Sequence, residues 1–210
     1  MKAILIGGFI ETIELLERLN IEICGIADSN EEKIYFKHRE KYTYIGNDDA
    51  LLNTSLESLK TKNLILSPDV PKIRRVLYDK YRSHGFTIIN VVSDKAIISP
   101  SANIINDTGV KILDGVNISS NVSIKECVKI NVNANIMHDC KIGAFSTIAP
   151  NAVLLGGVTL GENTYIGANS TILPLIMIGK NAVVGAGAVV TKDVMENSVV
   201  AGVPARVLTK

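Results

Sequence analysis

A period of six residues governs the hydrophobic positions in the second half of the chain. Every sixth residue from Ile112 to Val190 is Ile, Leu or Val. The column two residues earlier, from Val110 to Ala188, holds mostly small or β-branched residues and predicts a second inward-facing column. Asn or Gly recurs just before it, where a corner needs a positive φ or an Asx-type hydrogen bond. Each six-residue unit therefore predicts one short strand and one corner.

This repeat resembles that of the hexapeptide-repeat proteins, which fold into left-handed parallel β-helices. The run from Ile98 to Val194 keeps the period throughout. In that family three hexapeptides complete one triangular coil, so the resemblance implies roughly five stacked coils and the left-handed sense. A stack of coils leaves unpaired strand edges at both ends. We expect the N-terminal domain to cover one end and Asn197–Lys210 to cover the other.

One of the three histidines lies within the repeat, and the register decides which way it faces. His138 follows Ile136 by two positions, in a column that mixes charged residues, proline and glycine and therefore faces outward. Asp139 comes next, which brings an imidazole and a carboxylate together at a corner. One coil further along, Gly156 and Gly157 stack beside His138 as bare backbone. A general base beside unobstructed N–H donors is what acyl transfer needs, and the plainer alternative is a solvent-exposed histidine.

Other chemistries find fewer residues in this sequence. A zinc site of three histidines has only His138 to draw on in the repeat, so we expect no metal. Cys140 occupies an inward column and no G-x-S-x-G motif occurs, so the chain offers no catalytic nucleophile. His38 and His84 have no partner at ligand spacing and receive no role. Direct transfer from a bound donor remains.

Short apolar runs alternate with amphipathic stretches in the first ninety residues. Alternating strands and helices predict a small, mostly parallel, Rossmann-like sheet with right-handed crossovers. We therefore expect an α/β domain over residues 1–92 and a β domain over residues 93–210. The predicted strands lie at 3–6, 22–27, 63–66 and 86–92, and the predicted helices at 10–19 and 71–84.

The carboxyl ends of these strands place a candidate pocket on one rim of the sheet, since ligands of parallel sheets bind there. The rim collects Gly7, Gly8, Phe9 and Asp28. Gly7 and Gly8 would let a phosphate approach the backbone, and Asp28 would accept a hydrogen bond from a ribose or sugar hydroxyl. The alternative is a tight strand-to-helix turn flanked by an aspartate, because the third glycine of G-x-G-x-x-G is missing. Both interpretations stay open here.

Composition narrows the class of partner. The 22 basic and 21 acidic residues leave a net charge of +1, which gives no electrostatic reason to expect nucleic acid or an anionic membrane. The three cysteines lack C-x-x-C spacing, which fits a reducing compartment. The apolar run after Lys2 is too short for a signal peptide, and no run of membrane-spanning length follows. We expect a cytoplasmic protein that binds small molecules.

Nearly the whole chain resembles the bacterial sugar acetyltransferases. The resemblance rests on a small αβ domain followed by VVSDKAIISPSANI at 91–104, HDCKIGAFSTIAPNAVLLGG at 138–157 and VVAGVPARVL at 199–208. That family includes sialic acid O-acetyltransferases and the nucleotide-aminosugar N-acetyltransferases of surface-glycan synthesis. The resemblance implies a homotrimer with acetyl-CoA in the clefts between neighbouring helices. It makes His138 the general base and Asp139 the residue that polarises or orients it.

The resemblance also implies where the two substrates lie. The acceptor would be anchored by Gly7, Gly8, Phe9 and Asp28 and would reach His138 from the N-terminal domain. Thr147 stands where some relatives carry a second histidine, so that role is not transferred. The residues implied for acetyl-CoA, from the thioester to the adenine end, are Gly156, Gly157, Gly167, Ala168, Ala186, Gly187, Lys192, Pro204 and Arg206.

The acceptor is the least determined part of this prediction. N-acetylation of a nucleotide aminosugar is favoured, and O-acetylation of the sialic acid type is the alternative, since one histidine can serve either. A catalytically idle trimeric scaffold that binds a nucleotide sugar is an alternative from another class. Transfer of a longer acyl chain from a carrier protein also stays open.

Overall fold

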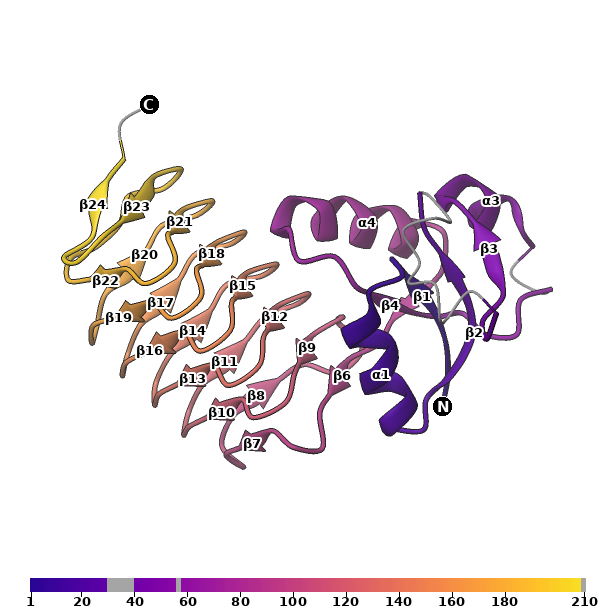
Figure 1. Cartoon of the computed structure of the whole chain (residues 1–210), viewed down its shortest axis with the longest axis horizontal. Coiled ribbons are helices and arrows are strands. Elements are labelled where there is room, and N and C mark those ends of the chain that lie inside the picture. The colour runs from indigo at the N-terminus through magenta and orange to yellow at the C-terminus, as the bar shows by residue number, and fades with distance from the viewer. Residues whose placement is uncertain (30–39, 56–57, 209–210) are drawn as a thin grey trace.

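The N-terminal part of the chain forms a five-stranded parallel sheet in the computed structural model, which describes residues 1–29, 40–55 and 58–208 (Figure 1). The strand order is β3-β2-β1-β4-β5. The strands are β1 (Lys2–Ile6), β2 (Glu22–Ala27), β3 (Tyr44–Gly46), β4 (Asn63–Leu66) and β5 (Thr87–Ile88). The described helices are α1 (Ile10–Arg18), α3 (Asp48–Asn53) and α4 (Pro71–Ser83).

Two helices on opposite faces explain why the central strands are apolar throughout. Ile13 and Leu16 of α1 pack in one cluster with Leu5 of β1, whereas Tyr81 of α4 packs in a second cluster with Ile4 of β1. Parallel strands that are covered on both faces carry continuous apolar runs rather than alternating ones. The structure thus has both predicted helices and the first three predicted strands, with ends that differ by at most one residue.

The predicted strand at 86–92 is wrong as a single element. Its first part, β5, pairs with β4 in the N-terminal sheet, and its second part, β6 (Val91–Val92), pairs with β9 (Lys111–Ile112) of the repeat. Asn90 occupies the junction: its side-chain oxygen accepts from the N–H of Val110 at 2.9 Å, and its amide donates to a backbone carbonyl at 2.7 Å. A polar side chain tied to the neighbouring coil therefore separates two apolar pairs that read as one run in the sequence.

The rest of the chain is a β-helix with three faces, whose strands are parallel except for the last one (Figure 1). The β13 face holds β7 (Ile97–Ile98), β10 (Asn117–Ile118), β13 (Asn135–Ile136), β16 (Val153–Leu154), β19 (Thr171–Ile172) and β22 (Val189–Val190). The β14 face holds β8 (Asn103–Ile104), β11 (Ser123–Ile124), β14 (Lys141–Ile142), β17 (Thr159–Leu160) and β20 (Met177–Ile178). The β12 face holds β6, β9, β12 (Lys129–Ile130), β15 (Thr147–Ile148), β18 (Tyr165–Ile166), β21 (Val183–Val184), β23 (Val199–Ala201) and β24 (Arg206–Val207).

The interior of the β-helix follows the six-residue period closely from Val110 onward. The expectation that the period runs unbroken from Ile98 is wrong, because β8 and β9 begin eight residues apart and Ile98 and Ile104 lie in the column of Ile118 and Ile124. All fourteen residues of the column from Ile112 to Val190 are at most 3% exposed, and all fourteen of the column from Val110 to Ala188 are at most 7% exposed. The pairing shifts by eighteen residues per coil, for example Asn117 with Asn135 and Asn135 with Val153. The corner residues that the sequence marks have positive φ, namely Asn133, Asn151, Gly157, Asn163, Asn169, Asn181 and Gly187.

The N-terminal domain covers the β12 face rather than the end of the prism. The outward side chains of Lys111, Lys129 and Thr147 are at most 3% exposed beneath it, whereas Ile97 on the first strand of the β13 face is 71% exposed. The expectation that this domain caps one end is therefore wrong in its geometry. At the other end, β23 pairs with β21 in parallel and β24 pairs back on β23, as the terminal segment predicted.

Buried Arg74 of α4 ties the two parts together. Its guanidinium donates to the carbonyls of Cys127, Phe145 and Ser146 at 3.0, 2.7 and 2.9 Å and to the Thr147 hydroxyl at 2.9 Å. Two further bonds go to the carbonyls of residues 68 and 69 within the N-terminal domain. Burial lowers the pKa of Arg74 to about 10, which keeps the group charged at neutral pH. The two parts are thus held in one orientation.

Candidate active site

His138 and Asp139 form a hydrogen-bonded pair at the corner between the β13 and β14 faces. His138 Nδ1 lies 2.8 Å from Asp139 Oδ2, and both side chains are more than half exposed. Asp139 adopts φ +61°, a conformation that aspartate tolerates because its side chain bonds locally. With Nδ1 held by the carboxylate, Nε2 of the neutral ring is left to accept a proton.

Asn121 orients the carboxylate from the preceding coil. Its amide donates to Asp139 Oδ1 at 3.2 Å, while His138 occupies Oδ2. The hydrogen bond from His138, and then that from Asn121, holds the pKa of the Asp139 carboxyl below its usual value. The carboxylate therefore stays ionised beside the ring. Sequence analysis missed Asn121, although a shift of one coil from Asp139 points to it.

Gly156 forms the wall beside the imidazole. A Cβ placed on Gly156 would lie 2.5 Å from His138 Cε1 and 2.7 Å from Nε2, so any side chain there would displace the ring. The register fixes this stacking, because the N–H of Gly157 donates to the His138 carbonyl at 2.9 Å. Of the two expected N–H donors, that of Gly157 is therefore already used. The Gly156 N–H has no hydrogen-bond acceptor in the described part of the chain.

The residues expected along acetyl-CoA do not form one continuous wall in a single chain. Gly156, Gly157 and Lys192 lie on the His138 corner, because each follows a strand of the β13 face. Ala168 and Ala186 follow strands of the β12 face and lie on the corner between the β12 and β13 faces, together with Gly167 and Gly187. Within one chain, the residues expected along acetyl-CoA thus lie on two different corners.

Gly167 and Gly187, which lie beside these alanines, are explained by different features of the structure. A Cβ on Gly167 would lie 2.5 Å from the Ala186 nitrogen, so close stacking of coils explains that residue without a ligand. Gly187 has φ +66° and no heavy atom within 4 Å of the place of its Cβ. The surface at Gly187 is therefore open.

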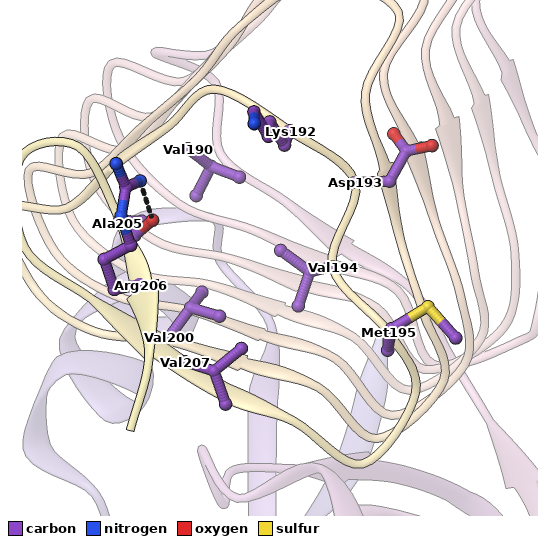
Figure 2. Close-up of a pocket in the computed structure, with 9 residues that line it drawn as sticks. All are labelled: Val190, Lys192, Asp193, Val194, Met195, Val200, Ala205, Arg206 and Val207. Carbon is purple, nitrogen blue, oxygen red and sulfur yellow. Dashed lines mark hydrogen bonds between the residues drawn. The ribbon is translucent and has the colours of Figure 1, made fainter. Parts of the chain in front are cut away.

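A pocket of about 330 Å³ lies at the C-terminal end of the β-helix (Figure 2). Val190, Val194 and Val200 line its interior, and Lys192 and Arg206 lie at its edge. Pro204 precedes this edge in the β23–β24 turn. An apolar floor with two cations suits a flat ring that carries phosphate groups. The three valines are core residues of the last coil, which is why the sequence pattern did not mark them as lining a pocket.

The predicted rim of the N-terminal sheet is also hollow. A pocket of about 340 Å³ is lined by Gly7, Phe9 and Asp28, and also by Pro68 and Ile73, which sequence analysis missed. Asp28 accepts a hydrogen bond from the Gly8 N–H at 2.9 Å, and Gly7 has φ +88°. The turn interpretation therefore accounts for Asp28 and Gly7, and the same turn shapes the pocket. Pro68 follows the end of β4 as Gly7 follows β1, and that parallel is the signal that would have found it.

The rim pocket and His138 belong to different sides of one chain. The N-terminal domain meets the β-helix across the β12 face, where Arg18 pairs with Asp114 on one flanking corner and Arg75 pairs with Glu162 at 3.0 Å on the other. His138 lies on the third corner, away from that face. Within one chain, the rim pocket therefore lies apart from His138, and the approach of the acceptor to His138 stays a prediction.

His84 and Thr147 lie in contacts that the fold explains. His84 ends α4 with Nδ1 2.7 Å from the Lys80 carbonyl, and His38 lies outside the described residues. Thr147 is buried and donates to the Asp69 carbonyl at 2.6 Å, so it serves the domain contact. No group of three or more metal-binding side chains gathers among the described residues. No helix in the same ranges is long and apolar enough to cross a membrane.

Known proteins with a similar sequence or fold agree with the architecture described above. Residues 121–156 and 157–192 match the family model described as bacterial transferase hexapeptide (six repeats). A GDP-perosamine N-acetyltransferase from Caulobacter crescentus, solved with CoA and GDP-perosamine, is 29% identical, has a TM-score of 0.89, and aligns over 100% of this chain and 98% of its own. Residues 121–192 thus carry the hexapeptide repeat of bacterial transferases, and the chain is an acyltransferase.

Two further solved structures are similar to this acyltransferase. The acetyltransferase domain of PglB from Neisseria gonorrhoeae FA1090, in complex with acetyl coenzyme A, is 27% identical with a TM-score of 0.84 over 99% of this chain and 98% of that one. WeeI from Acinetobacter baumannii AYE, at 24% identity, shares the fold with a TM-score of 0.85 over 99% of this chain and 100% of its own. The predicted resemblance to hexapeptide-repeat sugar acetyltransferases, the fold class and the enzyme class are confirmed.

Proposed function

We propose that this acyltransferase transfers the acetyl group of acetyl-CoA to the amine of a nucleotide-linked aminosugar. The observation that carries the proposal is the His138–Asp139 pair beside the bare backbone of Gly156. The similarity to a GDP-perosamine N-acetyltransferase over the whole chain favours a nucleotide aminosugar over a free sugar. The proposal places the enzyme in the cytoplasm, in the synthesis of a surface glycan.

The chemistry follows from the way His138 is held. Acetyl-CoA supplies an activated thioester carbonyl. His138 Nε2 accepts the proton from the acceptor amine as the amine attacks that carbonyl, and Asp139 stabilises the resulting imidazolium through Nδ1. The Gly156 N–H donates to the oxygen of the carbonyl as negative charge develops there. The C–N bond forms, the C–S bond breaks, and the thiol of CoA leaves with a proton.

The split of the site over two corners supports a site shared between copies. His138 and Gly156 of one copy would face the corner with Ala168, Ala186 and Gly187 of its neighbour. The neighbour's N-terminal domain would bring the acceptor in the pocket beside Gly7 and Phe9. Such a contact joins different surfaces, so it forms a closed ring when the rotation between copies closes, and an open filament otherwise. We propose that the ring is a homotrimer, because three copies of a three-sided β-helix can each place one corner against a neighbour.

The donor would run toward the C-terminal end of the β-helix. Lys192 lies three coils beyond His138 on the same corner, because Ile172 pairs with Val190 as Ile136 pairs with Leu154. Three strand spacings amount to roughly 14 Å, which an extended pantetheine arm can span. Lys192 and Arg206 would then meet the phosphate groups at the edge of the terminal pocket.

An acetylation assay with a panel of acceptors tests the proposal. The purified protein is incubated with acetyl-CoA and with GDP-, UDP- or dTDP-linked aminosugars or sialic acid, and CoA release and product mass are measured. We expect acetylation of a nucleotide aminosugar and a fall of about 10²- to 10⁴-fold in kcat for His138→Asn. His84→Asn, on the exposed end of α4, is the matched control and should keep full activity.

Three outcomes contradict the proposal. Acetylation of sialic acid without any N-acetylation would establish the O-acetyltransferase alternative. Binding of a nucleotide sugar without transfer from any thioester would establish the scaffold. Undiminished kcat in folded His138→Asn would remove the proposed base.

A further inference from the structure

Two lysines lie side by side beneath the N-terminal domain. Lys111 of β9 and Lys129 of β12 are partners in the parallel ladder of the β12 face, so their backbones lie one strand spacing apart, about 4.8 Å. Both residues are 3% exposed. Like charges directly opposite each other in a sheet are destabilising, and burial adds the cost of taking each charge out of water. Two ammonium groups are therefore an unfavourable pair at this place.

The charged groups around Lys111 do not balance its charge. Lys129 Nζ pairs with the Asp69 carboxylate, which follows β4. The other charged groups that act on Lys111 are Arg74 of α4, a further cation, and Glu11 of α1, which is exposed to solvent. Within the described residues, three cationic side chains thus share one paired carboxylate in the contact between the N-terminal domain and the β-helix.

The hydrogen bonds of Lys111 are those of an uncharged amine. Its Nζ donates to the Thr12 hydroxyl of α1 and to the Ser67 carbonyl, which follows β4, at 3.1 Å each. A neutral amine has two N–H donors, whereas an ammonium has three. The described chain offers Nζ no third acceptor at bonding distance. Burial, and then the charge of Lys129, lowers the pKa of Lys111 well below its usual range.

Both hydrogen bonds of Lys111 cross the contact between the two parts of the chain. Lys111 belongs to the β-helix, whereas Thr12 and Ser67 belong to the N-terminal domain. A proton added to this amine creates a buried charge without a carboxylate partner, and that charge regains its hydration when the two parts separate.

We propose that the protonation state of Lys111 controls how tightly the N-terminal domain sits on the β12 face. The neutral amine holds the two parts together, and the ammonium form loosens them. When the contact opens, Lys111 meets water and its pKa returns to the ordinary lysine value. Between the lowered and the ordinary pKa the open form binds one proton more than the closed form, so each unit of falling pH favours opening by about tenfold.

The consequence concerns the rim pocket, because the N-terminal domain carries it. A loosened contact moves this pocket relative to the β-helix. Lys111 therefore couples the placement of the rim pocket to pH, although the pocket and the amine do not share a lining residue.

Two buried cysteines allow opening of the contact to be measured. Cys127 is fully buried and packs with Tyr81 and Phe145 where α4 meets the β-helix. Cys140 is fully buried in the interior of the β-helix itself. The protein is exposed to a thiol reagent at a series of pH values, and peptide mass spectrometry gives the labelling rate of each cysteine. Each rate is divided by that of free cysteine at the same pH, which removes the titration of the thiol.

We expect the normalised rate at Cys127 to fall by up to about tenfold for each unit of rising pH, over the range in which Lys111 loses its proton. Cys140 should stay protected throughout. Lys111→Met has a side chain of similar length that cannot titrate, so Cys127 should label slowly at every pH. Lys141→Met is the matched control, because Lys141 holds the same position of the repeat on the exposed β14 face. This control should keep the wild-type slope.

A wild-type rate at Cys127 that does not change with pH overturns the proposal, and so does an equal slope in Lys111→Met. Equal labelling of Cys127 and Cys140 would mean that the whole chain unfolds, which also overturns it. If Lys111→Met does not fold, carbon-13 NMR titration of the Lys111 ε-carbon in the wild-type protein decides. A midpoint well below that of exposed lysines is expected, and a midpoint equal to theirs overturns the proposal.

Discussion

The β12 face and the His138 corner are built from the same six-residue repeat, yet their outward side chains have opposite surroundings. On the β12 face, Lys111, Lys129 and Thr147 are buried under the N-terminal domain. At the corner, His138 and Asp139 are more than half exposed. The repeat decides which side chains face outward, and the second domain decides which of those reach water. One scaffold can therefore carry a structural contact on one side and reactive groups on another.

The ionisable side chains on the buried β12 face need hydrogen-bond partners more than those at the exposed corner do. Burial lowers the pKa of Lys111 well below its usual range, and its amine donates to the Thr12 hydroxyl and the Ser67 carbonyl at 3.1 Å each. Lys129 pairs with the Asp69 carboxylate. Such groups leave water only when hydrogen bonds replace their hydration. The exposed pair at His138 has no such requirement, because both side chains keep contact with water.

The largest expected effect comes from the buried side. Arg74→Leu removes six hydrogen bonds and leaves carbonyls of both domains without donors. We expect a loss of about 3–5 kcal/mol in the free energy of unfolding, measured by denaturant titration. Arg82→Leu, an exposed residue of the same helix, should change stability by less than about 0.5 kcal/mol. Equal effects for the two variants would mean that Arg74 does not hold the domains together.

The next effect concerns the exposed corner. In Gly156→Ala the new methyl group meets the His138 ring and turns it away from the Asp139 carboxylate. We expect kcat to fall by about tenfold to a hundredfold with little change in melting temperature, because a misplaced catalytic group costs rate rather than packing. Ser120→Ala changes the stacked position on the other side of His138 and should leave kcat intact. Full activity in Gly156→Ala would show that the ring needs no such wall.

The smallest expected effect comes from removing the hydrogen bond between Asn121 and Asp139. Asn121→Ala removes one bond that lowers the pKa of the Asp139 carboxyl, so that pKa should rise toward its usual value. A carboxylate with a lowered pKa stabilises the fold above its ordinary pKa and loses this contribution as pH falls through the lowered value. In the variant that contribution should therefore be smaller, and its loss in acid should be complete at a higher pH.

Carbon-13 NMR titration of the Asp139 carboxyl group measures this change directly. The same variant should lower kcat by less than about tenfold, since His138 keeps its own bond to Asp139. An unchanged titration would mean that Asn121 contributes nothing to the charge of the pair.

The repeat made much of this molecule predictable. A period of six places Ile112 and thirteen later residues inside, and it places Gly156 against His138, because both follow from the strand register alone. The contacts between domains were not predictable in this way. Lys111 and Lys129 are lysines at outward positions of the repeat, which the sequence alone would place at the surface. Only the packing of the N-terminal domain shows that they are buried. The residues predicted to bind acetyl-CoA lie on two different corners, and this division is seen only when the strands are assigned to the three faces.

The sharpest test of a shared site mixes two inactive copies. His138→Asn removes the base, and Ile73→Arg places a long charged side chain at the acceptor pocket. Each variant alone should be inactive in the acetylation assay. When the two are co-assembled with separate tags, a site that takes His138 from one copy and the acceptor pocket from the next is intact in roughly one case in four. Recovery of about a quarter of wild-type kcat is the predicted result, and mixed oligomers that remain inactive would contradict an active site built from two copies.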